Sequence, residues 1–467
     1  MPDSLSLTLG RWAVRLGFDD LPPDVVAATK DRMLDVIGLA LAGAGTPFGR
    51  SVRAAARALS PPGPSRVLGT GDRVGVATAA FANGSFAQAL EFDDTHNESI
   101  VHMSSPSVAA ALALAEAAIA GAVSGRDLLA AVAVGSEISC RVGCVAPGRF
   151  HRLGFHPTGL FAPFGVAYLA ARLLRLDEGA AARAAGICGS FAAGLLECWV
   201  DGTQPKFLHP GWAAHSGIAA ALLARAGTTG PAAIFEGRFG LFASHLQDPS
   251  VPRNLERIVD RLGERWESRN ASFKPFPAAH VLHPYIDALL RLRRRHGIAP
   301  ADVARIECPV AAFIVPIVCE PVAEKVAPAS DSHGRVSLQY TLAEALVRGE
   351  LGKDAYSDES RHNPEILALA QRVQYVVDPG MPGPGRFKGV VRLTLADGRT
   401  FVETEEFNRG SAEHPMSAAE LRAKFDANAS PFLPAEARDR LADAVACLEQ
   451  EPRADRLVDL ACRPMKQ

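Results

Sequence analysis

Apolar side chains recur at helical spacing through the first 260 or so residues of the chain. One such series contains Val25, Met33 and Leu41, and it begins after Pro23 and Asp24, two residues typical of a helix start. The same spacing predicts further helices over 75–91, 106–122, 126–143, 158–174, 178–192 and 212–226. Many positions in these segments are Ala or Gly, which permits close helix–helix approach. The pattern therefore predicts a compact, largely buried helical bundle.

The pattern changes after about residue 265. Residues 303–308 alternate between apolar and polar, which is typical of a strand. Residues 389–404 alternate on both sides of Asp397-Gly398, a pair that favours a hairpin turn. Among these strands we expect helices over 281–295 and 337–348, a loop over 378–385, and a return to helix over 416–462.

These patterns predict a mainly α protein, with a large all-helical domain and a smaller α+β domain. The 467 residues are enough for two domains. We place the helical domain at 1–265, completed by 405–467, and the small α+β domain at 266–404.

Composition narrows the possible partners. Lys and Arg together number 49 against 51 for Asp and Glu, so the chain has no overall field that would attract nucleic acid or anionic lipid. The most apolar run, Val108 to Val123, is too short to span a bilayer comfortably, and we interpret it as a buried helix. Residues 1–10 lack the pattern of a signal peptide. We therefore expect a cytoplasmic protein with no nucleic-acid or membrane partner.

The eight cysteines do not form a metal-binding pattern. No C-x-x-C pair occurs, which disfavours zinc or iron–sulfur ligation. Cys188, Cys319 and Cys447 have apolar neighbours, as expected for reduced, buried thiols. The chain also lacks a G-x-S-x-G elbow, an H-E-x-x-H helix and a Walker A loop.

Two segments of the helical part gather groups suited to acid/base chemistry. Residues 91–102 follow an apolar helix and include Glu91, Asp93, Thr95 and His102. Carboxylates close to histidines fix their tautomer and raise their pKa. Residues 154–159 place His156 directly before Pro157 at the start of a helix, where backbone N–H groups can bind an anion. A solvated helix end and a helix cap are the structural alternatives.

Two further segments carry lysines. Lys206 and His209 would share a face if the turn between them is helical. Lys274 comes just before Pro275 and Pro277, which stiffen the chain at the proposed domain junction. His283 falls in the first turn of the next helix. A lysine in apolar surroundings is costly unless it meets an anion, such as a substrate carboxylate. A hydrated surface loop and an interdomain hinge are the alternatives.

Taken in order, the landmarks of the chain resemble the MmgE/PrpD family, which includes 2-methylcitrate dehydratase, cis-aconitate decarboxylase and iminodisuccinate epimerase. The landmarks are Ala89-Leu90-Glu91-Phe92-Asp93-Asp94-Thr95, His102 with Ser105-Pro106-Ser107, Gly154-Phe155-His156-Pro157-Thr158, Lys206-Phe207-Leu208-His209-Pro210-Gly211, Thr229-Gly230-Pro231, Phe235-Glu236-Gly237, Lys274-Pro275-Phe276-Pro277 and Leu338-Gln339-Tyr340. The resemblance covers nearly the whole chain. It implies a homodimer with no metal or organic cofactor and an active site between the two domains.

The resemblance also implies site residues. Those that fall where the family has pocket residues are Glu91, Thr95, His102, His156, Lys206, Lys274 and Tyr340. Two features depart from the family pattern. The segment between Thr95 and His102 is longer than in the decarboxylase, and Ala279 stands where the decarboxylase has a histidine. The second departure disfavours decarboxylation of cis-aconitate.

These observations predict a hydro-lyase that removes water from a small hydroxy-polycarboxylic acid such as 2-methylcitrate by metal-free acid/base catalysis. The expected catalytic residues are His102, His156, Asp93 and Lys206, with either histidine as the base. The expected substrate-binding residues are Glu91, Thr95, His209, Lys274, His283 and Tyr340. An epimerase or isomerase, a decarboxylase, and a non-catalytic binding protein for organic anions are the alternatives.

Overall fold

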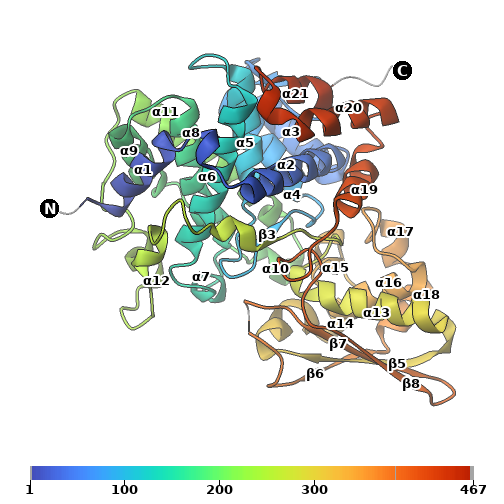
Figure 1. The fold of residues 1–467 in the computed structure, drawn as a ribbon. Coiled ribbons are helices and arrows are strands. Elements are labelled where there is room, and N and C mark those ends of the chain that lie inside the picture. The colour runs from blue at the N-terminus through green and yellow to red at the C-terminus, as the bar shows by residue number, and fades with distance from the viewer. Residues whose placement is uncertain (1–2, 384, 463–467) are drawn as a thin grey trace.

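A computed structural model describes residues 3–383 and 385–462 of the chain. A large body of packed helices is joined to a smaller body in which helices lie on a four-stranded sheet (Figure 1). The predicted fold class, mainly α with a smaller α+β part, is therefore confirmed.

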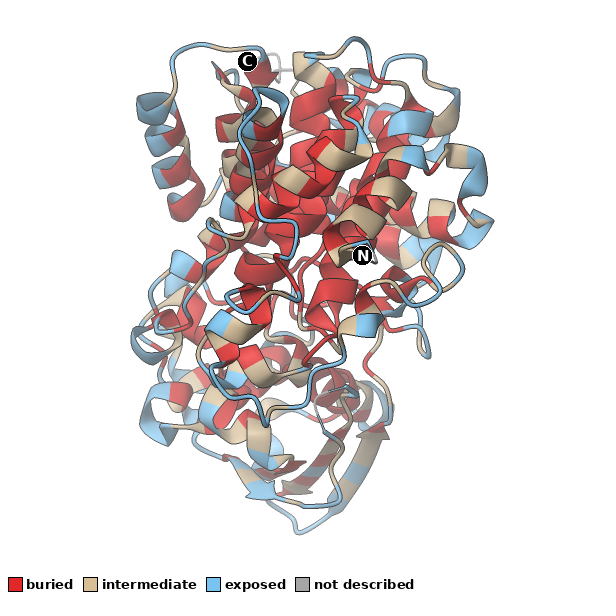
Figure 2. Ribbon diagram, turned by 90° about the vertical axis from the view of Figure 1, so that its left-hand side faces the viewer, coloured by how far each residue is buried: buried red, intermediate tan, exposed pale blue. Residues whose placement is uncertain are grey.

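The helical body contains the first twelve α-helices. Their bounds are α1 (Leu5–Arg15), α2 (Pro23–Ala44), α3 (Pro47–Leu59), α4 (Val76–Gln88), α5 (Ser104–Ala117), α6 (Gly125–Gly143), α7 (Arg149–Arg152), α8 (Pro157–Leu173), α9 (Glu178–Cys188), α10 (Cys198–Asp201), α11 (His209–Arg225) and α12 (Leu241–Leu246). Helices α4, α5, α6 and α8 are buried along almost their whole length, as the red ribbons in Figure 2 show. The expected buried helix over 108–123 ends earlier, because Ala118 turns to a positive φ of 48°.

Small residues let these helices touch backbone to backbone. A Cβ added to Gly211 of α11 would lie 2.2 Å from the carbonyl oxygen of Phe81 in α4. A Cβ on Gly165 of α8 would lie 2.1 Å from the carbonyl oxygen of Gly135 in α6. The bundle therefore depends on glycine at its closest crossings.

The small body is built on the sheet β6-β5-β7-β8. The strands are β5 (Val303–Val310), β6 (Val373–Val377), β7 (Gly389–Leu395) and β8 (Thr400–Glu405), and only β5 and β6 run parallel. Its helices are α13 (His283–His296), α14 (Val322–Val326), α15 (Asp331–Gly334), α16 (Leu338–Arg348), α17 (Asp358–Arg361) and α18 (Pro364–Ala370). Helix α13 packs on β7 and β8, and α16 packs on β6. The predicted strand, hairpin and two helices are all present.

The last helices, α19 (Ala418–Ala429), α20 (Ala435–Ala446) and α21 (Arg456–Ala461), lie beside the N-terminal part of the chain (Figure 1). Lys424 of α19 forms a buried ion pair with Asp35 of α2, at 2.8 Å between Nζ and Oδ1, and donates to the carbonyl oxygen of Phe92. The short strand β3 (Thr95–His96) pairs antiparallel with β4 (Ala271–Ser272), just before the chain enters the small body.

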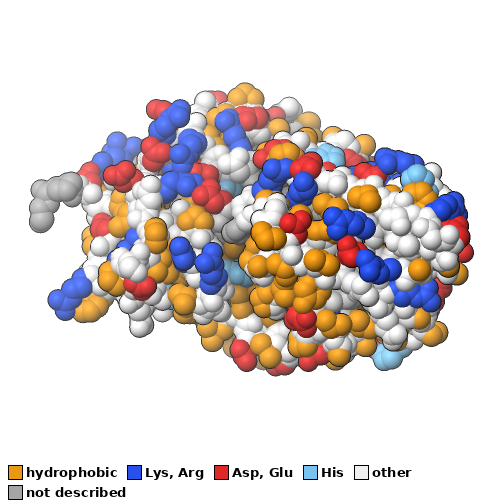
Figure 3. Space-filling view, turned by 90° about the horizontal axis from the view of Figure 1, so that it is seen from below, with side chains coloured by type: hydrophobic (Ala, Val, Ile, Leu, Met, Phe, Trp, Pro, Cys, Tyr) orange, Lys and Arg blue, Asp and Glu red, His pale blue; other side chains and the backbone are white. Residues whose placement is uncertain are grey.

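The cysteines are free thiols, and six of the eight are buried. Cys447 is an exception to the expectation, because the last turn of α20 leaves it exposed. None of the helices in the described part of the chain is both long and apolar enough to cross a membrane. Basic and acidic side chains alternate over the face seen in Figure 3, in keeping with the balanced composition.

Candidate active site

A cavity lies at the seam of the two bodies. The helical body contributes Glu91, Thr95, Asn97, Ile100, His102, Gly148, His151, Arg152, His156, Trp199 and Lys206. The small body and its connection contribute Lys274, Ala279, His280, Val281, Phe313, Ile317, Val336 and Phe387. Six of the predicted site residues thus meet in one cavity, although they come from four distant segments of the chain.

Glu91 sits between the two lysines. Its Oε2 lies 2.5 Å from Nζ of Lys206, and its Oε1 lies 3.0 Å from Nζ of Lys274, which also donates to the Glu91 carbonyl oxygen. Burial alone would raise the pKa of the Glu91 carboxyl, but the two ammonium groups outweigh burial and hold it well below its usual range. Burial lowers the pKa of Lys274, and Glu91 opposes that shift. The site therefore holds two buried cations with one carboxylate between them.

Local structure holds these three groups in place. Glu91 has a positive φ of 53°, which is uncommon for a residue other than glycine and turns the chain sharply after α4. Lys206 lies on a 3-10 turn (Pro205–Leu208) that leads into α11. Lys274 follows β4, whose pairing with β3 fixes its distance from Thr95. The buried guanidinium of Arg335 donates to the carbonyl oxygens of Leu90 and Pro277, and so ties both segments together.

His102 is oriented by its neighbours. Its Nδ1 lies 2.9 Å from the carbonyl oxygen of Asp94 and 3.2 Å from Oδ1 of Asp93. A carbonyl oxygen only accepts, so Nδ1 carries the proton and Nε2 of the neutral ring has a free lone pair. Within residues 3–383 and 385–462, Nε2 makes no hydrogen bond. The geometry suits a general base that faces the cavity, with Asp93 behind the ring.

His156 forms a pair with His209. Their Nδ1 atoms are 2.8 Å apart, so one ring donates to the other. Burial and the nearby Lys206 ammonium lower the pKa of His156 well below its ordinary value and that of His209 to about 4. Both rings are therefore neutral near pH 7. The buried Nε2 of His156 has no hydrogen-bond partner among the described residues, and the ring lies 5.6 Å from that of His102 between centroids.

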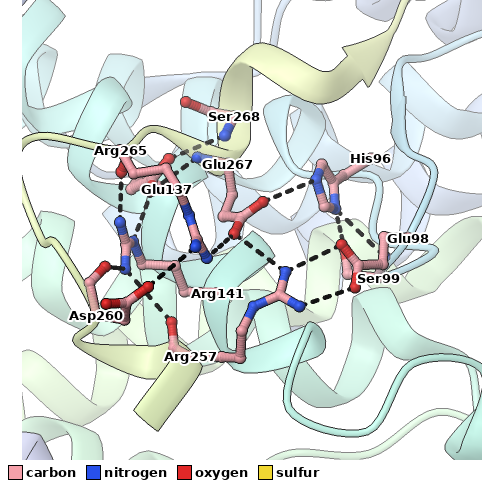
Figure 4. A network of polar contacts seen from close by, with 10 residues as sticks. All are labelled: His96, Glu98, Ser99, Glu137, Arg141, Arg257, Asp260, Arg265, Glu267 and Ser268. Carbon is pink, nitrogen blue, oxygen red and sulfur yellow. Dashed lines mark hydrogen bonds and ion pairs between the residues drawn. The ribbon is translucent and has the colours of Figure 1, made fainter. Parts of the chain in front are cut away.

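A partly buried ionic layer supports the site from the side of α6. Figure 4 shows Arg257 between Glu98 and Glu267, with nitrogen–oxygen distances of 3.0 Å and 3.1 Å. Glu137 accepts from the backbone N–H groups of Glu267 and Ser268, at 2.9 Å each. These contacts fix the chain just before β4, and therefore the approach to Lys274.

Within that layer, His96, Cys144 and Glu267 could in principle share a metal ion, since their ligand atoms lie within 4.8 Å of one another. Two features disfavour it. Glu267 already accepts from the guanidinium groups of Arg257 and Arg265. The backbone N–H of Ser99 donates to Nδ1 of His96, which leaves the proton on Nε2, the atom that faces Glu267. We interpret this group as structural.

The remaining predicted residues do not line the cavity. Asp93 and His209 lie behind His102 and His156. His283 donates from Nε2 to the carbonyl oxygen of Ala278 and lies behind His280, at 5.1 Å between ring centroids. Tyr340 is buried in the core of the small body beside Tyr356, at 6.0 Å between rings. The position of Tyr340 in the sequence does not indicate which side of its helix faces the cavity.

Sequence reasoning also missed residues that do line it. His280 lines the cavity next to Ala279. Its Nε2 lies 2.8 Å from Nδ2 of Asn408. His151 and Arg152 come from α7, with Arg152 exposed. His280 stood within a segment already singled out, whereas the two residues of α7 had no sequence signal beyond their charge.

Comparison with known proteins identifies the family of the chain. The profile of the MmgE/PrpD N-terminal domain matches residues 7–254, and that of the MmgE/PrpD C-terminal domain matches residues 276–450. The chain is 28% identical to the cis-aconitate decarboxylase-like protein oryM of Aspergillus oryzae, over 98% of this chain and 97% of that protein. It is 28% identical to the cis-aconitate decarboxylase of Homo sapiens, over 91% and 88% of the two chains.

A more distant relative is the 2-methylcitrate dehydratase of Cupriavidus necator, which is 25% identical over 78% of this chain and 75% of that protein. The relatives are enzymes of two reaction types, and the two family profiles together cover most of the sequence. The chain belongs to the MmgE/PrpD family of enzymes.

Proposed function

We propose that this enzyme removes water from a small hydroxy-polycarboxylic acid by acid/base catalysis that needs no metal. The observation that carries the proposal is the meeting of Lys206, Lys274, His102 and His156 at one cavity. Two ammonium groups match a substrate with more than one carboxylate, and one free imidazole nitrogen can accept a proton from carbon.

The proposed reaction uses these groups as follows. Nε2 of His102 takes the proton from the carbon next to a substrate carboxylate. The electron pair of that C–H bond forms the new double bond while the C–O bond to the hydroxyl group breaks. The hydroxyl leaves as water with the proton that His102 has accepted, while the neutral ring of His156, whose Nε2 has no partner among the described residues, binds the departing group by a hydrogen bond. Lys206 and Lys274 stabilise the negative charge that develops on the carboxylate.

Decarboxylation of cis-aconitate is a second candidate, favoured by the names of the relatives that align over nearly the whole chain. One residue of the cavity argues against decarboxylation and one argues for it. Ala279 offers no acid or base, whereas the neighbouring His280 does line the wall. Burial and the nearby His283 and Lys274 keep the pKa of His280 well below its ordinary value, so the ring is neutral and an inefficient acid near pH 7.

A single experiment separates these reactions. Purified enzyme in deuterated water is followed by proton NMR with citrate, 2-methylcitrate, cis-aconitate, tartrate and aspartate-derived acids. Dehydration gives an alkene signal without carbon dioxide. Loss of carbon dioxide from cis-aconitate would establish the second candidate. Deuterium uptake without an alkene would indicate an epimerase, and tight binding with no change in any acid would indicate a binding protein.

We also propose that two copies of the chain associate. The family resemblance supports a homodimer, and Leu153, Leu195 and Val200 expose 54–69% of their surface on segments next to the cavity. Burial of such side chains by a second copy would be favourable. Light scattering on the purified protein distinguishes one copy from two. The buried free thiols support a reducing compartment such as the cytoplasm.

A further inference from the structure

The side chains that line the cavity are of two chemical kinds. One kind comprises the ionic and imidazole groups described above. The other is apolar and comprises Trp199, Val281, Phe313, Ile317, Val336 and Phe387. All but Trp199 belong to the small body, so the apolar wall faces the catalytic groups across the seam.

The apolar wall continues beyond the cavity. A second, smaller hollow shares Val281, Phe313 and Phe387 with it and is lined further by Ile314 and Met381, as well as by the charged Arg386 and Lys388. Four of the five apolar side chains are only partly buried. Water in contact with such a wall is readily displaced by an apolar group of a ligand.

We propose that the substrate carries an apolar substituent, longer than methyl, which lies along this wall while its carboxylates meet Lys206 and Lys274. The inference rests on the proposed function for the position of the carboxylates. A substrate that is polar throughout would place a carboxylate or hydroxyl against apolar side chains such as Phe313 and Ile317, which cannot replace its hydration. An alkyl chain gains from the same surface, by roughly threefold to fourfold in affinity for each buried methylene.

Binding of a ligand series tests the inference without reference to turnover. Calorimetry compares succinate with methyl-, butyl- and hexylsuccinate, which share the same two carboxylates. We expect the dissociation constant to fall with each methylene until the hollow is filled, by roughly 50-fold or more between methyl and hexyl. Equal affinity across the series, or weaker binding of the longer chains, would overturn the inference.

A matched pair of variants locates the effect. Ile317→Ser removes apolar surface from the wall, so it should reduce the preference for hexyl- over methylsuccinate by at least fivefold. Val322→Ser makes the same kind of change at a residue outside the cavity that is 44% exposed, and should leave the preference unchanged. An equal loss of this preference in both variants, or no loss in Ile317→Ser, would mean that the alkyl group of the ligand binds elsewhere, and would contradict the inference.

Turnover then separates this inference from the proposed function. If alkylcitrates are dehydrated faster than citrate, both stand. If long-chain ligands bind tightly but no hydroxy acid loses water, the proposed function fails and the apolar subsite stands. If citrate is dehydrated but the succinate series shows no dependence on chain length, the proposed function stands and the subsite fails.

Discussion

At the residue scale, the buried triad of Glu91, Lys206 and Lys274 sets the chemistry of the cavity. Its net charge is positive, and it is held in a place where isolated ions would be expensive. A substrate carboxylate would add the second negative charge that two ammonium groups can accommodate. The triad therefore acts as a preformed receptor for anions.

Removal of one ammonium should weaken that receptor. In Lys206→Met we expect tricarballylate, an unreactive tricarboxylate, to bind about 10- to 100-fold more weakly by calorimetry, since a hydrogen bond between charged groups contributes about 1.5–3 kcal/mol. Lys353→Met changes the same residue type at a site paired with the exposed Asp354 and should bind as the wild type does. Unchanged affinity in Lys206→Met would remove this lysine from the site.

The tautomer of His102 leads to a second expectation. His102→Gln keeps a polar group of similar length but cannot accept the substrate proton, so kcat should fall by about 10²- to 10⁴-fold with little change in KM. His362→Gln, at an exposed histidine of the small body, should have no effect on either constant. If kcat of His102→Gln stayed within a few-fold of the wild type, another group would be the base.

Sequence reasoning was most effective for residues with distinctive chemistry. Lys206 and Lys274 could be singled out because a lysine among apolar neighbours calls for an anion. The sequence does not indicate in the same way which side of a helix faces the substrate. Tyr340 is therefore expected in the cavity, although in the structure it packs against Tyr356. The two differ because the position of a residue within a helix does not specify which neighbouring element packs against its side chain.

At the scale of elements, periodicity predicted seven helices of the bundle to within about five residues, but it did not predict α1 or α3. It did not predict β6, whose residues are mostly exposed and do not alternate, or the two-residue strands β3 and β4. Those short strands exist only because distant segments meet. Yet the pairing of β3 with β4 positions Thr95 and Lys274 together, so the element that most affects the site is the one with the weakest sequence signal.

The close crossing of α4 and α11 gives an expectation about stability. Gly211→Ala would place a methyl group 2.1 Å from Oγ of Ser85 and 2.2 Å from the carbonyl oxygen of Phe81. The helices would have to separate, which should lower the free energy of unfolding by about 1–3 kcal/mol in urea denaturation. Gly352→Ala, where the added methyl group has open space, serves as the control. Equal stability of both variants would show that the crossing is looser than described.

At the scale of the whole molecule, the neutral buried histidines should make the fold sensitive to acid. His209 has a folded-state pKa of about 4, below the ordinary value near 6.5, because burial and Lys206 disfavour its charged form. The unfolded chain therefore binds this proton first as the pH falls, and stability is lost between about pH 6.5 and pH 4.

A variant tests the contribution of that histidine. His209→Asn should lose less stability than the wild type between pH 7 and pH 4.5, with the difference limited to about 3 kcal/mol by the size of the pKa shift. Urea denaturation at both pH values measures it. His362→Asn, exposed in both states, should behave as the wild type does. An identical acid loss in wild type and His209→Asn would mean that His209 is protonated in the folded protein.

The most direct measurement is a crystal structure of the enzyme with tricarballylate bound. Carboxylate oxygens should lie within hydrogen-bond distance of Nζ of Lys206 and of Lys274, with Nε2 of His102 facing the carbon next to one of them. A fully occupied ligand that contacts neither lysine, or a ligand bound away from the seam of the two bodies, would contradict the account.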